Sequence, residues 1–88
     1  MRDSFNYKLI LEVHNLIKEA KENFLVYVSD GFLNTEGKKI QILIIRKYAR
    51  AFNDKKYFSY LRKNKEEDFL RMLRCIEEEI LNYLPTSK

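Results

Sequence analysis

The 88-residue chain has only one cysteine, one proline, two glycines and no tryptophan. Because Cys75 has no second cysteine to pair with, the sequence excludes a small disulfide-stapled fold and favours a reducing, cytoplasmic setting. Long hydrophobic runs are also missing, since uncharged stretches such as 24–29 and 40–45 are far too short to span a bilayer. Charged residues such as Lys8 and Glu12 interrupt the first segment, so we expect no signal peptide and no membrane partner.

The composition is that of a folded chain. Hydrophobic residues make up 45% of the sequence and charged residues 34%, which is typical of a protein that folds and not of a disordered one. A chain this short buries a smaller share of its surface than a larger protein does, so its core must be modest. We therefore expect residues 1–88 to form a single domain that ends in a short C-terminal tail over 85–88.

Apolar residues recur at helical spacing along most of the chain, which predicts a mainly α fold. Asp3 or Ser4 is a candidate N-cap for the first helix, and Asn34 or Thr35 for the second. Pro85 ends the last helix, which opens with three acidic residues that suit the positive end of its dipole. The predicted helices run to about residue 22 and then over about 38–52, 55–62 and 66–84. Together they form one small bundle of three to four helices, with the last packed across the first and the third segment.

Residues 24–45 allow a second interpretation. The apolar run within 24–29 fits a strand or the last turns of a helix equally well. β-Branched residues are also present in 39–45, although both faces of a strand there would be apolar. The alternative is therefore an α+β fold with a short β-hairpin near residues 24–45. In either case Gly31 ends the preceding element, and the sequence predicts one loop over 30–37.

Positive charge is concentrated in the middle of the chain. The whole sequence has 17 Lys and Arg against 13 Asp and Glu, a net charge of +4. Residues 38–65 contain ten Lys and Arg and one acid, Asp54, which gives this segment a charge of +9. The flanking segments are acidic, at −2 for 1–37 and −3 for 66–88. Such a concentrated field favours a polyanionic ligand and indicates nucleic acid, either DNA or RNA.

The predicted site is a basic face formed by residues 38–65. If 38–52 is helical, several cations fall within one sector of it, and the others follow on the next short helix. Tyr60 is the best placed of the interleaved aromatic residues to stack on an unpaired base, because it lies off the apolar face of its helix. The candidate residues are Lys39, Arg46, Lys47, Arg50, Lys55, Lys56, Tyr60, Arg62 and Lys63. We predict a small non-catalytic nucleic-acid-binding protein, acting as a regulator or as a subunit of a nucleoprotein complex.

Two other interpretations compete with this one. The acidic first and last helices could neutralise the basic middle within the molecule, and most aromatic rings are then expected in the core. Alternatively, the chain is a helical protein–protein interaction adaptor or inhibitor, with a homodimer as one form of it. Ile42, Ile45 and Ala49 support this alternative because they lie off the main apolar stripe of their helix.

Catalytic and metal-binding patterns are few. His14 is the only histidine and has no second His or Cys at ligand spacing, so it is interpreted as structural. Cys75 is interpreted as a small, partly buried hydrophobic residue. The glutamates at 77–79 wrap around their helix, so their carboxylates do not converge as an acid–base pair must. We expect a protein that is not an enzyme and that needs no metal or cofactor.

Overall fold

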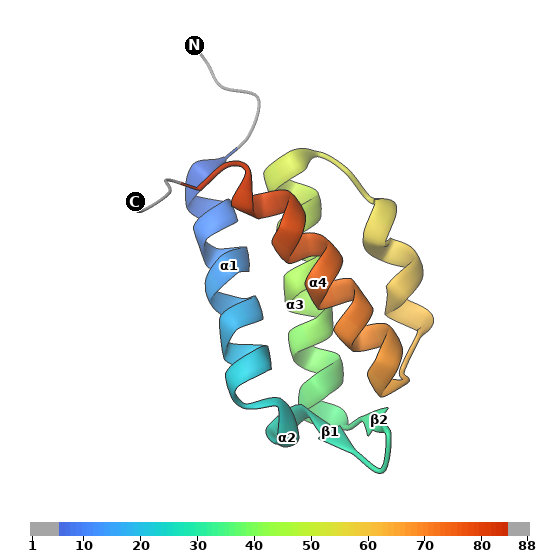
Figure 1. The fold of residues 1–88 in the computed structure, drawn as a ribbon. Helices are drawn as coiled ribbons and strands as arrows, with labels where there is room; N and C mark the ends of the chain where they lie inside the picture. Colours follow the sequence, from blue (N-terminus) through green and yellow to red (C-terminus); the bar gives the residue numbers. More distant parts are fainter. Residues whose placement is uncertain (1–5, 85–88) are drawn as a thin grey trace.

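The computed structural model describes residues 6–84 and shows a mainly α fold (Figure 1). The prediction of a small helical bundle is confirmed. The elements are α1 (Tyr7–Glu22), α2 (Phe24–Tyr27), β1 (Val28–Ser29), β2 (Phe32–Leu33), α3 (Thr35–Phe52), the 3₁₀ helix η1 (Lys56–Arg62) and α4 (Glu66–Leu81). Among these helices, none combines the length and the hydrophobicity needed to cross a membrane.

The helix boundaries follow from local hydrogen bonds. Asn6 caps α1, because its side-chain oxygen accepts a hydrogen bond from the backbone N–H of Leu9 at 3.2 Å. The expected caps Asp3 and Ser4 lie outside the described residues, as does the predicted tail over 85–88. Of the two candidate caps Asn34 and Thr35, Asn34 caps α3, with its side-chain oxygen 2.8 Å from the nitrogen of Gly37. At the other end of α3, Asn53 adopts a left-handed conformation with φ of 53°, which ends the helix.

The hairpin differs from the one considered in the sequence. A short β-hairpin does lie near residues 24–45, but it pairs β1 with β2, and residues 39–45 are helical. Ile40 and Ile44 are buried whereas Ile42 between them is exposed, a spacing that fits a helix and not the alternation of a strand. The predicted turn is confirmed at Gly31, whose φ is +84°. The expected loop over 30–37 is wrong, because it contains β2 and the first turn of α3.

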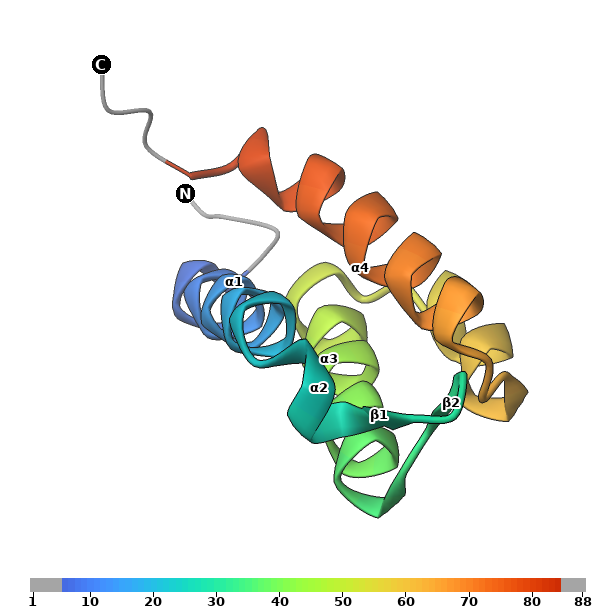
Figure 2. The ribbon, with the colours of Figure 1, turned by 60° about the horizontal axis from the view of Figure 1, so that its bottom comes forward.

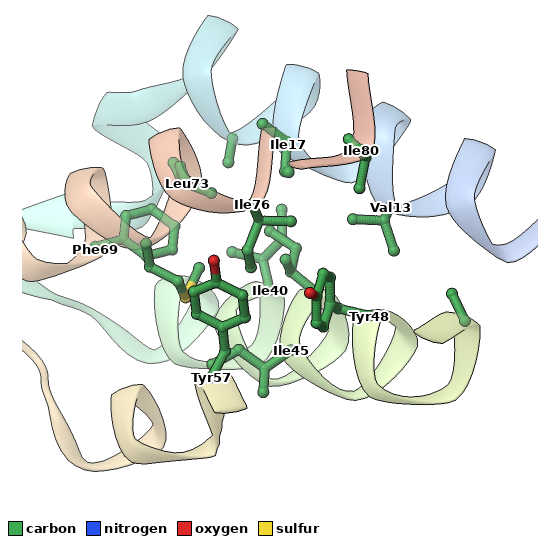
Figure 3. Close-up of a cluster of buried hydrophobic side chains, with 14 of the residues drawn as sticks. Val13, Ile17, Ile40, Ile45, Tyr48, Tyr57, Phe69, Leu73, Ile76 and Ile80 are labelled. Atoms are coloured by element: carbon green, nitrogen blue, oxygen red, sulfur yellow. The ribbon is translucent and has the colours of Figure 1, made fainter. Parts of the chain in front are cut away.

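The helices form two layers around one core. Helices α1, α3 and η1 lie side by side, with α3 in the middle, and α4 lies across one side of them (Figure 2). The expected packing of the last helix against the first and third segments is therefore confirmed. Ile17, Phe69, Ile76 and Ile80 are fully buried between the layers (Figure 3). The side of α3 turned away from α4 carries no further helix in the described part of the chain (Figure 2).

One polar side chain is buried where α3 meets η1. Gln41 is 1% exposed, and its amide nitrogen donates hydrogen bonds to the backbone oxygens of Tyr60 at 2.8 Å and Lys63 at 2.9 Å. These two carbonyls lie at the C-terminal end of η1, where the carbonyl of Tyr60 also accepts a hydrogen bond from the backbone N–H of Lys63 at 3.0 Å. Gln41 therefore holds the end of η1 against α3.

Replacing Gln41 by leucine is expected to lower the free energy of unfolding by about 1–3 kcal/mol. Leucine fills a similar volume, but it leaves the Lys63 carbonyl without its donor in a partly buried position. Urea unfolding followed by circular dichroism measures the change. The control is Lys38→Leu, at an exposed position on the same helix, which should shift stability by no more than about 0.5 kcal/mol. A Gln41→Leu protein as stable as wild type would contradict this role.

Candidate nucleic-acid interface

The exposed side of α3 brings three of the predicted site residues together. Lys39, Arg46 and Arg50 are exposed and stand seven and four residues apart, so they share a sector of about 40° on the helix. Ile42 and Leu43 lie between them along the helix and are 39% and 48% exposed. We call these five residues the outer face of α3. This face lies on the opposite side of the helix from the buried residues that contact α4.

Few acids oppose the cations of the outer face. Lys39 lies 3.6 Å from Glu36, but both side chains are more than 60% exposed, and a pair of this kind contributes little. Within residues 6–84, no carboxylate lies within ion-pair distance of Arg46 or Arg50. Both guanidinium groups are thus available to an external anion.

Lys47 sits at the border of this face and has an internal partner. Its Nζ lies 2.8 Å from Oε1 of Glu12 on α1, which ties α1 to α3. The hydrogen bond from Lys47 lowers the pKa of Glu12 below its ordinary value, and the charges of Lys8 and Arg50 act in the same direction. Lys47 is therefore engaged in holding two helices together.

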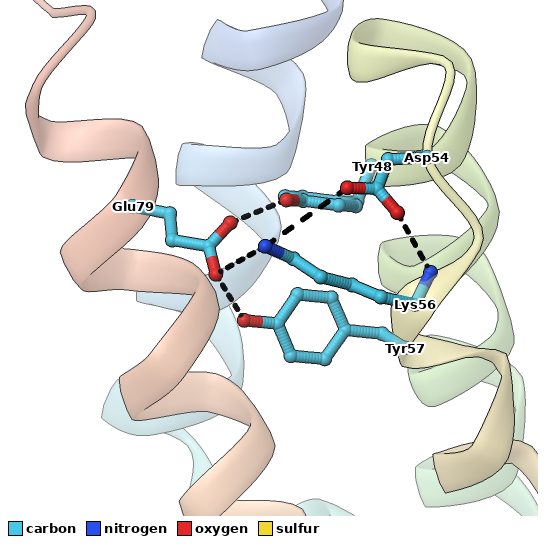
Figure 4. A network of polar contacts seen from close by, with 5 residues as sticks. All are labelled: Tyr48, Asp54, Lys56, Tyr57 and Glu79. Atoms are coloured by element: carbon cyan, nitrogen blue, oxygen red, sulfur yellow. Dashed lines mark hydrogen bonds and ion pairs between the residues drawn. The ribbon is translucent and has the colours of Figure 1, made fainter.

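Lys56 has two internal partners. Its Nζ lies 3.0 Å from Glu79 on α4 and 3.9 Å from Asp54, so it points toward α4 and away from the outer face of α3 (Figure 4). Together with Lys47, it shows that part of the basic middle is neutralised by the acidic first and last helices. This neutralisation is incomplete, because neither Arg46 nor Arg50 forms an ion pair within the described residues, although the charge of Arg50 acts on Glu12.

The other predicted cations belong to η1 and its ends. Lys55, Arg62 and Lys63 are exposed, and no carboxylate of the described residues forms an ion pair with them. The ammonium group of Lys55 lies 5.9 Å from the ring centre of Phe58. Arg62 and Lys63 line a shallow surface depression of about 650 Å³ on η1. Since η1 packs along α3, these cations add exposed positive charge on the neighbouring element.

Tyr60 does not stand out from the surface as a stacking platform. It is half-buried, packs against the core and lies 6.0 Å from the ring of Tyr57. Tyr48 and Tyr57 are only 2% and 7% exposed. Within 38–65, Phe58 is the exposed aromatic residue. The expectation that most of these rings belong to the core is confirmed.

Comparison of the chain with protein-family models, with curated proteins and with solved structures found no match.

A carboxylate that the sequence did not single out joins three elements. Glu79 on α4 accepts hydrogen bonds from the hydroxyl of Tyr48 on α3 and, at 2.6 Å, from that of Tyr57 on η1 (Figure 4). Burial opposes ionisation of Glu79, but the hydrogen bonds from both tyrosines and Lys56 outweigh it and lower its pKa. Burial and the bond to Glu79 raise the pKa of Tyr57. Each polar group of this cluster has a hydrogen-bond or ion-pair partner within it, so the cluster joins α3, η1 and α4. The lowered pKa of Glu79 does not suit a general acid or base at neutral pH.

Two other side chains that can take part in catalysis or metal binding, His14 and Cys75, are not part of the Glu79 cluster. Nδ1 of His14 is buried and has no hydrogen-bond partner among residues 6–84. Cys75 is a half-buried free thiol. No group of three or more His, Cys, Asp or Glu in the described ranges is arranged to hold a metal ion.

Proposed function

We propose that the protein binds nucleic acid through the outer face of α3, as a regulator or as a subunit of a nucleoprotein complex. The observation that carries this proposal is the alignment of Lys39, Arg46 and Arg50 on one exposed helix face, with no ion pair to either arginine within the described residues. The exposed cations of η1 extend the surface. A cytoplasmic location belongs to the same proposal and is supported by the lone thiol of Cys75.

The physical driving force is the release of counterions from the phosphate backbone. Each phosphate that a lysine or arginine neutralises frees condensed cations, so affinity falls steeply with salt. Arg46 and Arg50 can each donate two parallel hydrogen bonds to a phosphate, whereas Lys39 acts as a point charge. The aliphatic side chains of Ile42 and Leu43 lie between these contacts, where they can pack against sugars.

The double substitution Arg46→Glu/Arg50→Glu is expected to weaken nucleic-acid binding roughly tenfold or more at about 50 mM salt. It removes two of the three cations of the outer face of α3 and replaces them with charges that repel phosphate. Fluorescence anisotropy with labelled DNA and RNA measures the change. Both positions are exposed, so the fold should be retained.

A charge-matched control separates this site from the net charge of the protein. Lys18→Glu/Arg74→Glu changes the total charge by the same amount at exposed positions on α1 and α4. This control is expected to weaken binding by less than about threefold, because long-range charge effects are largely screened. An equal loss in both double variants, or no loss in Arg46→Glu/Arg50→Glu, would contradict the proposed site.

A second candidate function is a protein-interaction adaptor or inhibitor, including a homodimer. Leu25, Val26 and Phe32 are 85%, 55% and 52% exposed, which is unusual for large apolar residues. Of the residues that supported this alternative in the sequence, Ile42 is exposed, but Ile45 is fully buried and Ala49 is half-buried. Ile45 was misjudged because α3 packs against η1 as well as α1. Absence of binding to every nucleic-acid probe would favour this candidate.

A further inference from the structure

We infer that the outer face of α3 takes duplex nucleic acid and holds it by the phosphate backbone, without stacking on bases. This inference rests on the proposed function and narrows its ligand. It differs from the sequence-based expectation that Tyr60 stacks on an unpaired base, which would favour a single strand.

The first argument is the position of the aromatic rings. Proteins that hold single strands without sequence preference combine a basic groove with rings on which bases stack. Here Tyr48 and Tyr57 are buried and donate their hydroxyl hydrogens to Glu79. Tyr60 is half-buried against Tyr57, and its backbone oxygen accepts a hydrogen bond from Gln41. No aromatic ring belongs to the outer face of α3, so a base that met this face would find the aliphatic carbons of Ile42 and Leu43 and the guanidinium groups of Arg46 and Arg50.

The second argument is the rigidity and length of the cationic row. From Lys39 to Arg50 the outer face spans about 16 Å along the helix axis. Asn34 caps α3 at its start and Asn53 at its end, and α1 and η1 flank it along its length. The three cations therefore form a fixed row, which suits a stiff backbone better than a strand that must first be ordered.

The third argument is electrostatic. Without stacking on aromatic rings, a ligand is held mainly by charge, and the higher charge density of a duplex releases more counterions per contact than a single strand does. If three phosphates are contacted, affinity for a duplex should fall about 40-fold between 50 and 200 mM salt, and affinity for a single strand only about 20-fold. At the lower salt the duplex should bind more tightly.

The test is fluorescence anisotropy with one labelled oligonucleotide, alone and annealed to its complement, at about 50 and 200 mM salt. We expect tighter binding of the duplex, the steeper salt dependence described above, and affinities within about threefold for two duplexes of unrelated sequence. Tighter binding of the single strand would overturn this inference while leaving the proposed function in place. Absence of binding to both forms at the lower salt would overturn the proposed function itself.

Phe58 supplies an independent variant, because it is the exposed aromatic residue of the basic segment. Replacing Phe58 by alanine is expected to leave the affinities for both forms within about twofold of wild type. Base stacking on a ring contributes about 1–3 kcal/mol per base, so a stacking role would show as a loss of fivefold or more for the single strand. Such a loss would overturn the inference.

Discussion

Replacing Gly37 by alanine is expected to lower the free energy of unfolding by roughly 3 kcal/mol, at the upper end of overpacking costs. A Cβ at this position would lie 2.1 Å from the backbone oxygen of Tyr27 and 2.8 Å from Cδ2 of Leu33. The oxygen of Tyr27 cannot easily move away, since it accepts a hydrogen bond from the nitrogen of Asn34 at 3.0 Å. In a helix without such contacts the same substitution would raise the free energy of unfolding by about 1 kcal/mol. The sign of the measured change therefore shows whether the contacts of Gly37 are as close as described.

Urea unfolding followed by circular dichroism measures the effect of Gly37→Ala. Lys38→Ala is the matched control, because it adds alanine at the next position of α3, where the side chain is exposed. The control should remain within about 0.5 kcal/mol of wild type. A Gly37→Ala protein that is as stable as the control would contradict the close packing of α2 against the start of α3.

Replacing Glu79 by glutamine is expected to lower the free energy of unfolding by about 2 kcal/mol at neutral pH, the scale of losing hydrogen bonds to a charged acceptor. The amide carries no charge for Lys56 and offers the two tyrosine hydroxyls a single acceptor oxygen. Three elements depend on this carboxylate, because Tyr48 lies on α3 and Tyr57 on η1. The substitution should therefore loosen η1 as well as α4.

The loss of unfolding free energy caused by Glu79→Gln should depend on pH. The pKa of Glu79 is lowered from its ordinary value of 4.5 in the folded protein, so ionised Glu79 stabilises the fold fully above about pH 4.5. As the pH falls through the lower folded pKa, this contribution is lost. The stability difference between wild type and Glu79→Gln should thus be constant near neutrality and shrink below pH 4.5.

Glu78→Gln is the control for that series, because Glu78 is the exposed neighbour on α4. It should change stability by no more than about 0.5 kcal/mol at any of these pH values. Equal effects of the two substitutions, or a Glu79→Gln deficit that persists unchanged into acid, would contradict the role assigned to Glu79.

Much of the fold could be predicted because the helices carry their own signals. Amphipathic spacing indicated three of the helical segments, and Asn34 was one of two residues named as the cap of α3 from their residue types. The register of the short β pair could not be predicted, since it depends on the pairing of Leu33 with Val28 in the preceding segment. The segment at 55–62 was expected as a helix, but its 3₁₀ geometry and the hydrogen bonds from Gln41 to its C-terminal end are not signalled by its own residues.

Some features of the candidate site could be predicted from the sequence and others could not. Lys39, Arg46 and Arg50 share a face by helical spacing alone, so the sequence was sufficient to group them. The involvement of Lys47 and Lys56 in internal ion pairs could not be predicted, because their partners lie on other helices far along the chain. Glu79 was missed for the same reason, since its tyrosine donors are 31 and 22 residues away. No local pattern of acids signals such a convergence.

The most direct test of the outer face of α3 is the salt dependence of duplex binding in single variants. If Arg50 neutralises one phosphate, Arg50→Ala should reduce the slope of log K against log salt by about 0.9. Lys18→Ala, at an exposed position on α1, should leave the slope at its wild-type value. A slope that is the same in wild type, Arg50→Ala and Lys18→Ala would contradict the assignment of this face as the nucleic-acid interface.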